Sequence, residues 1–454
     1  MEQIKTKFTE YQSRITSWFM VHQILSLFLV FVGIYLAFDI EILWQPFIWS
    51  EDTIFLNESL VLGFPSIFNR HAAYLEILSR LSGYISILIG RLTNSYWNVT
   101  FMMRAISTLL GAYYIAYFWI EDFDWVLPGR KNRFFVSVLM LIWVCNFYNM
   151  MYNITSLHWI GEVYVFLIGL NLIKGRYPKC LDLILLVLTM LNSPEGCIIA
   201  APTVLMALSH VVKKEKDWKS IMFALLTSAC AILQIVMLLT GEYALYDKVE
   251  ELDFGWHLFF MTTNLFGFMI ECPMFLFGNQ VTFFAPNPIL LLMGGIFWYQ
   301  IKRLKSKELV PKLIFSYVLL FLFCHYVMVS YKYPIRISQS KDYWEHASVA
   351  CMMIVFISST KWDWKNLIKK RTIQILFVFV LCGQIAGIGK IHNPWDKYHI
   401  IGKDYYRYDY ALIGMDRLND VLDRVDFSSK NYERVSLYRD WCAMVPVAEE
   451  GGES

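Results

Sequence analysis

The sequence predicts an all-α polytopic membrane protein with about eleven transmembrane helices, amphipathic helices in a long first external loop and a small external C-terminal segment. Three observations lead to this fold class: the composition, the recurrence of long apolar runs, and the placement of Lys and Arg between the runs. Of the 454 residues, 57% are hydrophobic and only 17% are charged. A soluble globule of this length needs more polar residues to cover its surface, so a membrane protein is expected.

Eleven apolar runs approach the roughly 20 residues that a helix needs to cross about 30 Å of hydrocarbon. They are 18–38, 98–120, 134–152, 157–173, 180–193, 196–212, 220–241, 286–301, 313–331, 346–360 and 372–390. The runs 180–193 and 286–301 are short for a span. Each run is interpreted as one transmembrane helix.

Basic residues gather in every second connection between the runs. The clusters lie before the first run and at 130–133, 174–179, 213–219, 302–312 and 361–371. The intervening connections hold fewer Lys and Arg. By the positive-inside rule the N-terminus is cytoplasmic and residues 391–454 are external, which describes a multi-pass protein of the cytoplasmic (plasma) membrane.

The segment His71–Leu92 is apolar enough for a span, but a span here would reverse the sidedness of every later loop. Its apolar residues recur at helical spacing and its polar and small residues fall on the opposite face. The apolar stripe is Tyr74, Leu78, Leu81, Ile85, Leu88 and Leu92, and the other face is Glu76, Ser79, Arg80, Gly83, Ser86 and Gly90. Such a helix lies in the membrane interface, so 39–97 is predicted to be one long external loop.

Two domains are expected. Residues 1–390 form the transmembrane domain, and 391–454, which lack apolar runs and are rich in Tyr, Asp and Arg, form an external tail domain. The net charge of +2 is spread over short clusters, so a nucleic-acid partner is not expected. The nine Cys residues form no Cys-x-x-Cys pair and no set with His at ligand spacing, so they are interpreted as core residues. The sequence requires no cofactor, and a divalent metal stays open but has no motif that would bind it.

The stretch from Trp49 to Ser59 places two adjacent carboxylates, Glu51 and Asp52, just beyond the first apolar run. One interpretation is a helix start, because Ser50 is a good N-cap residue and acids in a first turn are favoured by the helix dipole. The other is catalytic, since a partly desolvated carboxylate has a raised pKa and can act as a general base. The two interpretations are compatible.

Other polar residues lie at the predicted membrane boundary, where burial in lipid would be costly. His158 and Glu162 are four residues apart at the external start of a run, a spacing that suits a hydrogen-bonded pair facing a cavity, while two ligands are too few for a metal. Glu195 lies in an external turn and is explained by turn chemistry alone or by a role in a pocket.

The late external loop 332–345 and the first residues after it are rich in basic and aromatic side chains, namely Lys332, Arg336, Lys341, Tyr343 and His346. They form either an ordinary exposed loop or a clamp for a lipid phosphate, to which Arg and Lys donate charge-assisted hydrogen bonds.

The order of these features resembles that of the GT-C superfamily of membrane glycosyltransferases, which use polyprenyl-phosphate sugars. A long first external loop opens with an acidic pair, continues with an amphipathic helix that contains Tyr74 and Arg80, and leads into a second span near Arg104. The group includes enzymes that decorate bacterial cell-wall polysaccharides or teichoic acids. The resemblance covers about residues 1–390.

The resemblance implies inverting transfer of a sugar from a polyprenyl phosphate such as undecaprenyl phosphate to a cell-envelope glycan on the external face. Asp52 matches the catalytic base, with Glu51 as its competitor, and Arg336, with Lys332 and Lys341, matches the cations that bind the donor phosphate. The pair here reads Glu-Asp where many relatives have Asp-Asp or Asp-Glu, so the identity of the base stays open. The remaining pocket candidates are His71, Tyr74, Arg80, His158, Glu162, Glu195, Tyr343 and His346.

Two other functions fit a chain of this kind. A flippase or polymerase of lipid-linked oligosaccharides also has many spans, although cations in the membrane centre are few here. A polytopic acyltransferase requires a catalytic His at the membrane boundary, where His158 and His346 are available.

Overall fold

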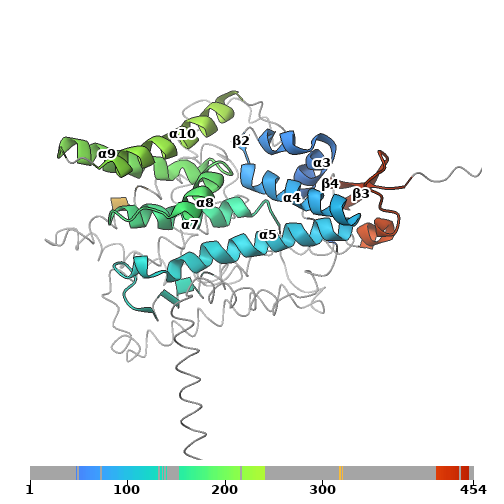
Figure 1. Ribbon diagram of the computed structural model, residues 1–454, viewed down its shortest axis with the longest axis horizontal. Helices are drawn as coiled ribbons and strands as arrows, with labels where there is room; N and C mark the ends of the chain where they lie inside the picture. Colours follow the sequence, from blue (N-terminus) through green and yellow to red (C-terminus); the bar gives the residue numbers. More distant parts are fainter. Residues whose placement is uncertain are drawn as a thin grey trace, which may run out of the picture.

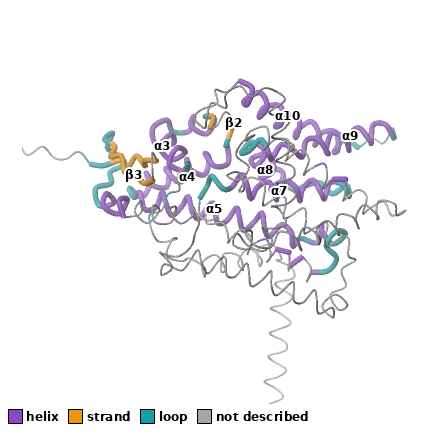
Figure 2. Tube along the Cα trace, turned by 180° about the vertical axis from the view of Figure 1, so that it is seen from behind, coloured by secondary structure: helices purple, strands orange, loops and turns teal. Residues whose placement is uncertain are grey.

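The computed structural model describes the central part of the chain and a C-terminal segment (Figures 1 and 2). The described residues are 46, 48, 51–71, 74–130, 133–134, 136–137, 140, 153–214, 217–240, 316–317, 320, 416–438 and 441–448. Figure 1 shows a bundle in which the long helix α5 (Tyr96–Ala116) runs along one side and α7 (Leu157–Leu172) lies beside it.

The first described segment is a helix, a short hairpin and a second helix. It consists of α3 (Asp52–Leu62), η1 (Phe64–Phe68), the antiparallel strands β1 (Arg70–His71) and β2 (Tyr74–Leu75), and α4 (Ile77–Thr93). Helix α3 ends at Gly63, whose φ of 68° is accessible to glycine at little cost. Helix α4 ends at Asn94 in the left-handed conformation, and Ser95 then caps α5 by accepting a hydrogen bond from the Asn98 amide.

Helix α7, all sixteen residues of which are buried, contacts most of the remaining helices. They are η2 (Tyr117–Trp119), η3 (Glu121–Phe123), α8 (Cys180–Met190), η5 (Glu195–Ile199), α9 (Ala200–Val212) and α10 (Trp218–Thr240). At its centre α7 stacks Tyr164 on Tyr114 of α5, and the Tyr164 hydroxyl donates to the carboxylate of Asp182 in α8. Helix α7 is therefore the core of the described bundle.

The C-terminal segment folds into a helical turn at 416–422 and an antiparallel hairpin of β3 (Tyr432–Tyr438) and β4 (Trp441–Pro446). Val435, Ala443 and Val445 form its buried side. The hairpin lies against α3 at the end of the bundle opposite α9 (Figure 1). The segment belongs to the predicted tail domain, whose boundary at 390/391 lies outside the described residues.

The predicted all-α fold with about eleven spans is wrong. Over the described residues, two helices are long and apolar enough to cross a membrane, Tyr96–Trp119 and Trp218–Thr240, whereas the prediction places five spans there. The predicted spans at 157–173, 180–193 and 196–212 are shorter helices, with α8 only 11 residues long. The chain also contains two small sheets.

The correction has a physical reason. Helix α7 is apolar because protein encloses it on all sides, and hydropathy alone does not distinguish a helix covered by protein from one covered by lipid. The predicted spans at 18–38, 286–301, 346–360 and 372–390 lie outside the described residues, as do most of 134–152 and 313–331.

Helices α4 and α10 turn their polar faces inward. In α10 the polar residues Ser220, Thr227 and Gln234 are buried, whereas Met222, Leu225, Ile232 and Leu239 are each at least 60% exposed. In α4 the predicted polar face with Ser79, Arg80 and Ser86 is buried, and the apolar stripe is exposed at Ile85, Leu88 and Leu92. This polarity is the reverse of that of a helix on the surface of a soluble protein.

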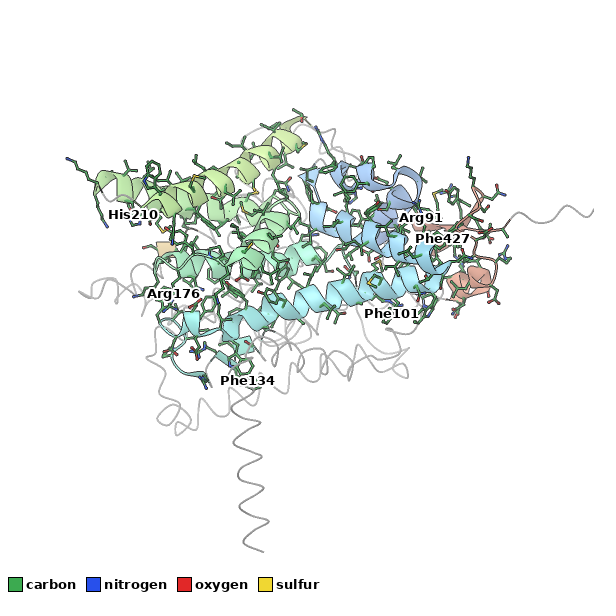
Figure 3. All side chains as sticks on the ribbon, in the orientation of Figure 1. Arg91, Phe101, Phe134, Arg176, His210 and Phe427 are labelled. Carbon is green, nitrogen blue, oxygen red and sulfur yellow. The ribbon has the colours of Figure 1, made fainter. Side chains whose placement is uncertain are left out.

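Described residues of the basic connections 130–133, 174–179 and 213–219 lie at one end of the bundle, where Arg133 binds Asp124. Arg176 binds Asp122, Lys174 lies over the ring of Trp125, and the Tyr177 hydroxyl donates to Asp217 beside His210. Figure 3 shows Arg176, His210 and Phe134 toward this end, and Arg91 and Phe427 at the other. The described helices therefore separate a basic end from the end that carries α3.

Candidate functional site

The carboxylate of Asp52 is completely buried at the first residue of α3. Its Oδ1 atom accepts two hydrogen bonds from Thr155, one from the backbone amide at 2.9 Å and one from the hydroxyl at 2.7 Å. Its Oδ2 atom has no hydrogen-bond partner among the described residues. One oxygen is thus held in place, and the other is buried without a described hydrogen-bond partner.

Burial raises the pKa of Asp52 from 3.8 to about 7, because the charged form loses its hydration. The hydrogen bonds from Thr155 and the Ile154 amide oppose this shift, and the neighbouring charge of Glu51 adds slightly to it. A carboxyl group with this pKa changes protonation state near neutral pH, as an efficient general base must.

The partner of Asp52 is the turn Asn153–Ser156, which precedes α7. Three helices fix this turn: Asp52 of α3 binds Thr155, Ser79 of α4 donates to the Ile154 carbonyl, and Ser107 of α5 donates to the Asn153 carbonyl. Within the turn, the Asn153 side chain accepts hydrogen bonds from Ser156. A polar junction of this kind aligns α3, α4 and α5 at the start of α7 and satisfies backbone groups that the turn leaves unpaired.

Arg80 of α4 is a buried cation that contacts α3 one to two turns after Asp52. The guanidinium of Arg80 is 0% exposed, forms an ion pair of 2.7 Å with Glu58, and donates to the carbonyls of Ser66 and Arg70. It also lies 5.2 Å from the ring centre of Phe55, three residues after Asp52. Arg80 therefore ties α4 to α3, η1 and β1.

The hairpin with His71 and Tyr74 lies next to this cation and is attached to α10. His71 meets the Phe55 ring edge-on at 5.7 Å, and Tyr74 is buried. The Gln234 side chain of α10 pairs with both the amide and the carbonyl of Leu75, as a neighbouring strand would. Sequence-predicted residues His71, Tyr74 and Arg80 are thus brought into one region with Asp52.

The other predicted residues fall in different surroundings. Glu51 is half-buried at the N-cap of α3 and its side chain makes no capping hydrogen bond. His158 and Glu162 are both buried on α7, one and two turns beyond Thr155. Glu195 begins η5, and its side chain is not among those described. Lys332, Arg336, Lys341, Tyr343 and His346 lie outside the described residues.

Three residues that build this region were not predicted from the sequence, Thr155, Asn192 and Glu58, and Ser79 was predicted only as part of the polar face of its helix. Thr155 and Asn192 each lie in a short polar stretch between apolar runs, at 153–156 and 192–195. This position is the sequence feature that could have identified them as site residues. Their partners are 103 and 113 residues away, and no local pattern encodes such pairings.

Comparison with family models, with curated proteins and with solved structures finds no match to this chain. In the described part of the chain no three His, Cys, Asp or Glu side chains gather in a group suited to a metal ion.

Proposed function

We propose that this protein is a membrane-bound glycosyltransferase that moves a sugar from a polyprenyl phosphate to a hydroxyl of a cell-envelope glycan, with Asp52 as general base. The observation that carries the proposal is the state of the Asp52 carboxylate: it is buried, Thr155 holds one oxygen, the other oxygen has no described hydrogen-bond partner, and the pKa is about 7. Glu51 is only half-buried, whereas Asp52 is completely buried, so Asp52 is proposed over its neighbour.

The proposed reaction is a single displacement with inversion. The Oδ2 atom of Asp52 takes the proton of the acceptor hydroxyl as the acceptor oxygen bonds to the anomeric carbon. The bond between that carbon and the phosphate oxygen breaks, and its electron pair leaves with the polyprenyl phosphate. Thr155 holds the base in one orientation during the transfer. The cations assigned to the phosphate, Arg336 with Lys332 and Lys341, remain a prediction.

The direct test uses purified protein and a synthetic polyprenyl-phosphate sugar. Free polyprenyl phosphate and sugar-labelled acceptor should appear in equal amounts. A protein that releases neither from any donor of this class would contradict the proposal. Release of lipid phosphate without labelled acceptor would indicate hydrolysis instead of transfer.

Membrane attachment is supported by the two helices that are long enough to cross a bilayer and by the inverted polarity of α4 and α10. We infer that Asp52 lies on the external side, because the basic connections gather at the opposite end of the bundle and basic loops stay in the cytoplasm. The exposed stripe of α4 then contacts lipid near the external interface.

Lipid contact is testable with a photoreactive phenylalanine analogue at Leu88 or Ile232, both exposed and apolar. In bilayers with labelled phospholipid, both positions should form lipid adducts on irradiation. The same analogue at Lys430, an exposed residue of the C-terminal segment, serves as the control and should form few. Equal labelling at the three positions would contradict the proposed lipid-facing surface.

The rate of transfer should depend on pH through Asp52. Because the ionised form is the base, the rate rises as pH increases through about 7 and becomes constant above it. Thr155→Val removes the hydroxyl that stabilises the carboxylate, so the pKa increases and the rising limb moves to higher pH. Rates measured from pH 5 to pH 9 check both statements, and a limb that stays in place in the variant would remove Thr155 from the mechanism.

A further inference from the structure

The C-terminal hairpin is hydrogen-bonded to the side chain of Asn57, which lies on α3. The amide nitrogen of Asn57 donates to the Cys442 carbonyl at 2.8 Å, and its carbonyl oxygen accepts from the Met444 amide at 2.8 Å. Strand β4 pairs with β3 along one edge, so Asn57 occupies the other edge in the manner of a neighbouring strand. Both bonds join residues more than 380 positions apart.

A second asparagine binds the same segment. The Asn94 side chain, at the end of α4, accepts from the Phe427 amide at 2.9 Å, and the Phe427 ring stacks on Tyr96. The ring fits here because Gly90 has no side chain, since a Cβ atom at Gly90 would lie 2.8 Å from it. The segment 416–447 thus contacts α3, α4 and α5 at one end of the bundle, where Figure 3 labels Phe427 and Arg91.

Helix α3 needs support from outside itself. It has only 11 residues, and isolated helices shorter than about 12–15 residues are marginal in water. Three of its polar side chains bind three different parts of the protein: Asp52 binds the turn before α7, Asn57 binds β4, and Glu58 binds Arg80 of α4. With about 100° per residue, these side chains are separated by about 140°, 100° and 120° around the helix axis.

We propose that the C-terminal hairpin is the third support of α3, and that Asn57 acts as a positioning residue which keeps Asp52 on Thr155. Contacts on one or two sides leave a helix free to rotate or tilt, whereas contacts on three sides fix its axis. The link from Asn57 to the reaction rests on the proposed function. The mechanical link between the hairpin and α3 is independent of the proposed function.

The test compares Asn57→Ala, Asn57→Asp and Arg424→Ala by hydrogen exchange and by transfer activity. Asn57→Asp retains the acceptor for the Met444 amide and loses the donor to Cys442. Arg424→Ala, the control, removes an exposed ion pair with Glu433 inside the segment. In Asn57→Ala, amide exchange should increase at least tenfold in both 441–446 and 52–62, with an intermediate effect in Asn57→Asp and little in the control.

Faster exchange in 441–446 with unchanged exchange in 52–62 would overturn the proposal, because the hairpin would then bind α3 without stabilising it. Under the proposed function, Asn57→Ala also lowers kcat about tenfold with the KM for the donor unchanged, and Asn57→Asp restores part of it. Coupled exchange with unaltered kcat would leave the support of α3 standing and contradict the role of Asn57 in positioning Asp52, whereas loss of the base role itself is tested by Asp52→Asn.

Discussion

Replacing Asp52 with Asn should abolish glycosyl transfer while the protein remains folded. The oxygen of the Asn side chain can accept both hydrogen bonds from Thr155, so the junction before α7 keeps its contacts. The amide nitrogen cannot take a proton from the acceptor hydroxyl. Because general base catalysis typically contributes about 10²–10⁴-fold, kcat should fall by at least about 100-fold.

The matched variant is Glu51→Gln, which removes the adjacent carboxylate at the half-buried N-cap. It should retain most activity, with the rising limb of the pH profile slightly lower, because the Glu51 charge raises the pKa of Asp52. Full activity in Asp52→Asn together with loss in Glu51→Gln would transfer the base role to Glu51. Thermal unfolding of both variants shows whether the fold is intact.

Replacing Glu58 with Leu should destabilise the protein strongly. The variant leaves the guanidinium of Arg80, which is 0% exposed, without its only described counter-charge and removes the acceptor of Asn69. Breaking a buried ion pair by removal of one partner costs about 3–5 kcal/mol. The expected loss is near the lower limit, since Glu58 is 30% exposed and Arg80 keeps its two carbonyl acceptors.

The control for this prediction is Glu433→Gln, which breaks the exposed pair with Arg424. Exposed ion pairs contribute about 0–1 kcal/mol, so the control should unfold at nearly the temperature of the unaltered protein. Unfolding in detergent, followed by tryptophan fluorescence, compares the two. Equal stability of Glu58→Leu and Glu433→Gln would show that Arg80 does not depend on its carboxylate partner.

The choice between Glu51 and Asp52 shows which features of the candidate site can be predicted from the sequence and which cannot. Local spacing identified the pair and the start of a helix, and α3 does begin at Asp52. It did not show that Asp52 binds Thr155, because that partner is 103 residues away. The pKa of Asp52 follows from burial, and burial is created by the packing of α3, α4 and α7 around the carboxylate.

The sequence by itself determined the two long apolar helices, Tyr96–Trp119 and Trp218–Thr240, and the two faces of α4, since length, apolar content and helical periodicity are local properties. Tertiary structure alone decided that α7 is apolar because protein surrounds it and that the polar face of α4 points inward. It also decided that Asn57 on α3 meets β4 from the far end of the chain. The physical reason is that each of these depends on what covers a side chain, and the covering groups come from distant parts of the sequence.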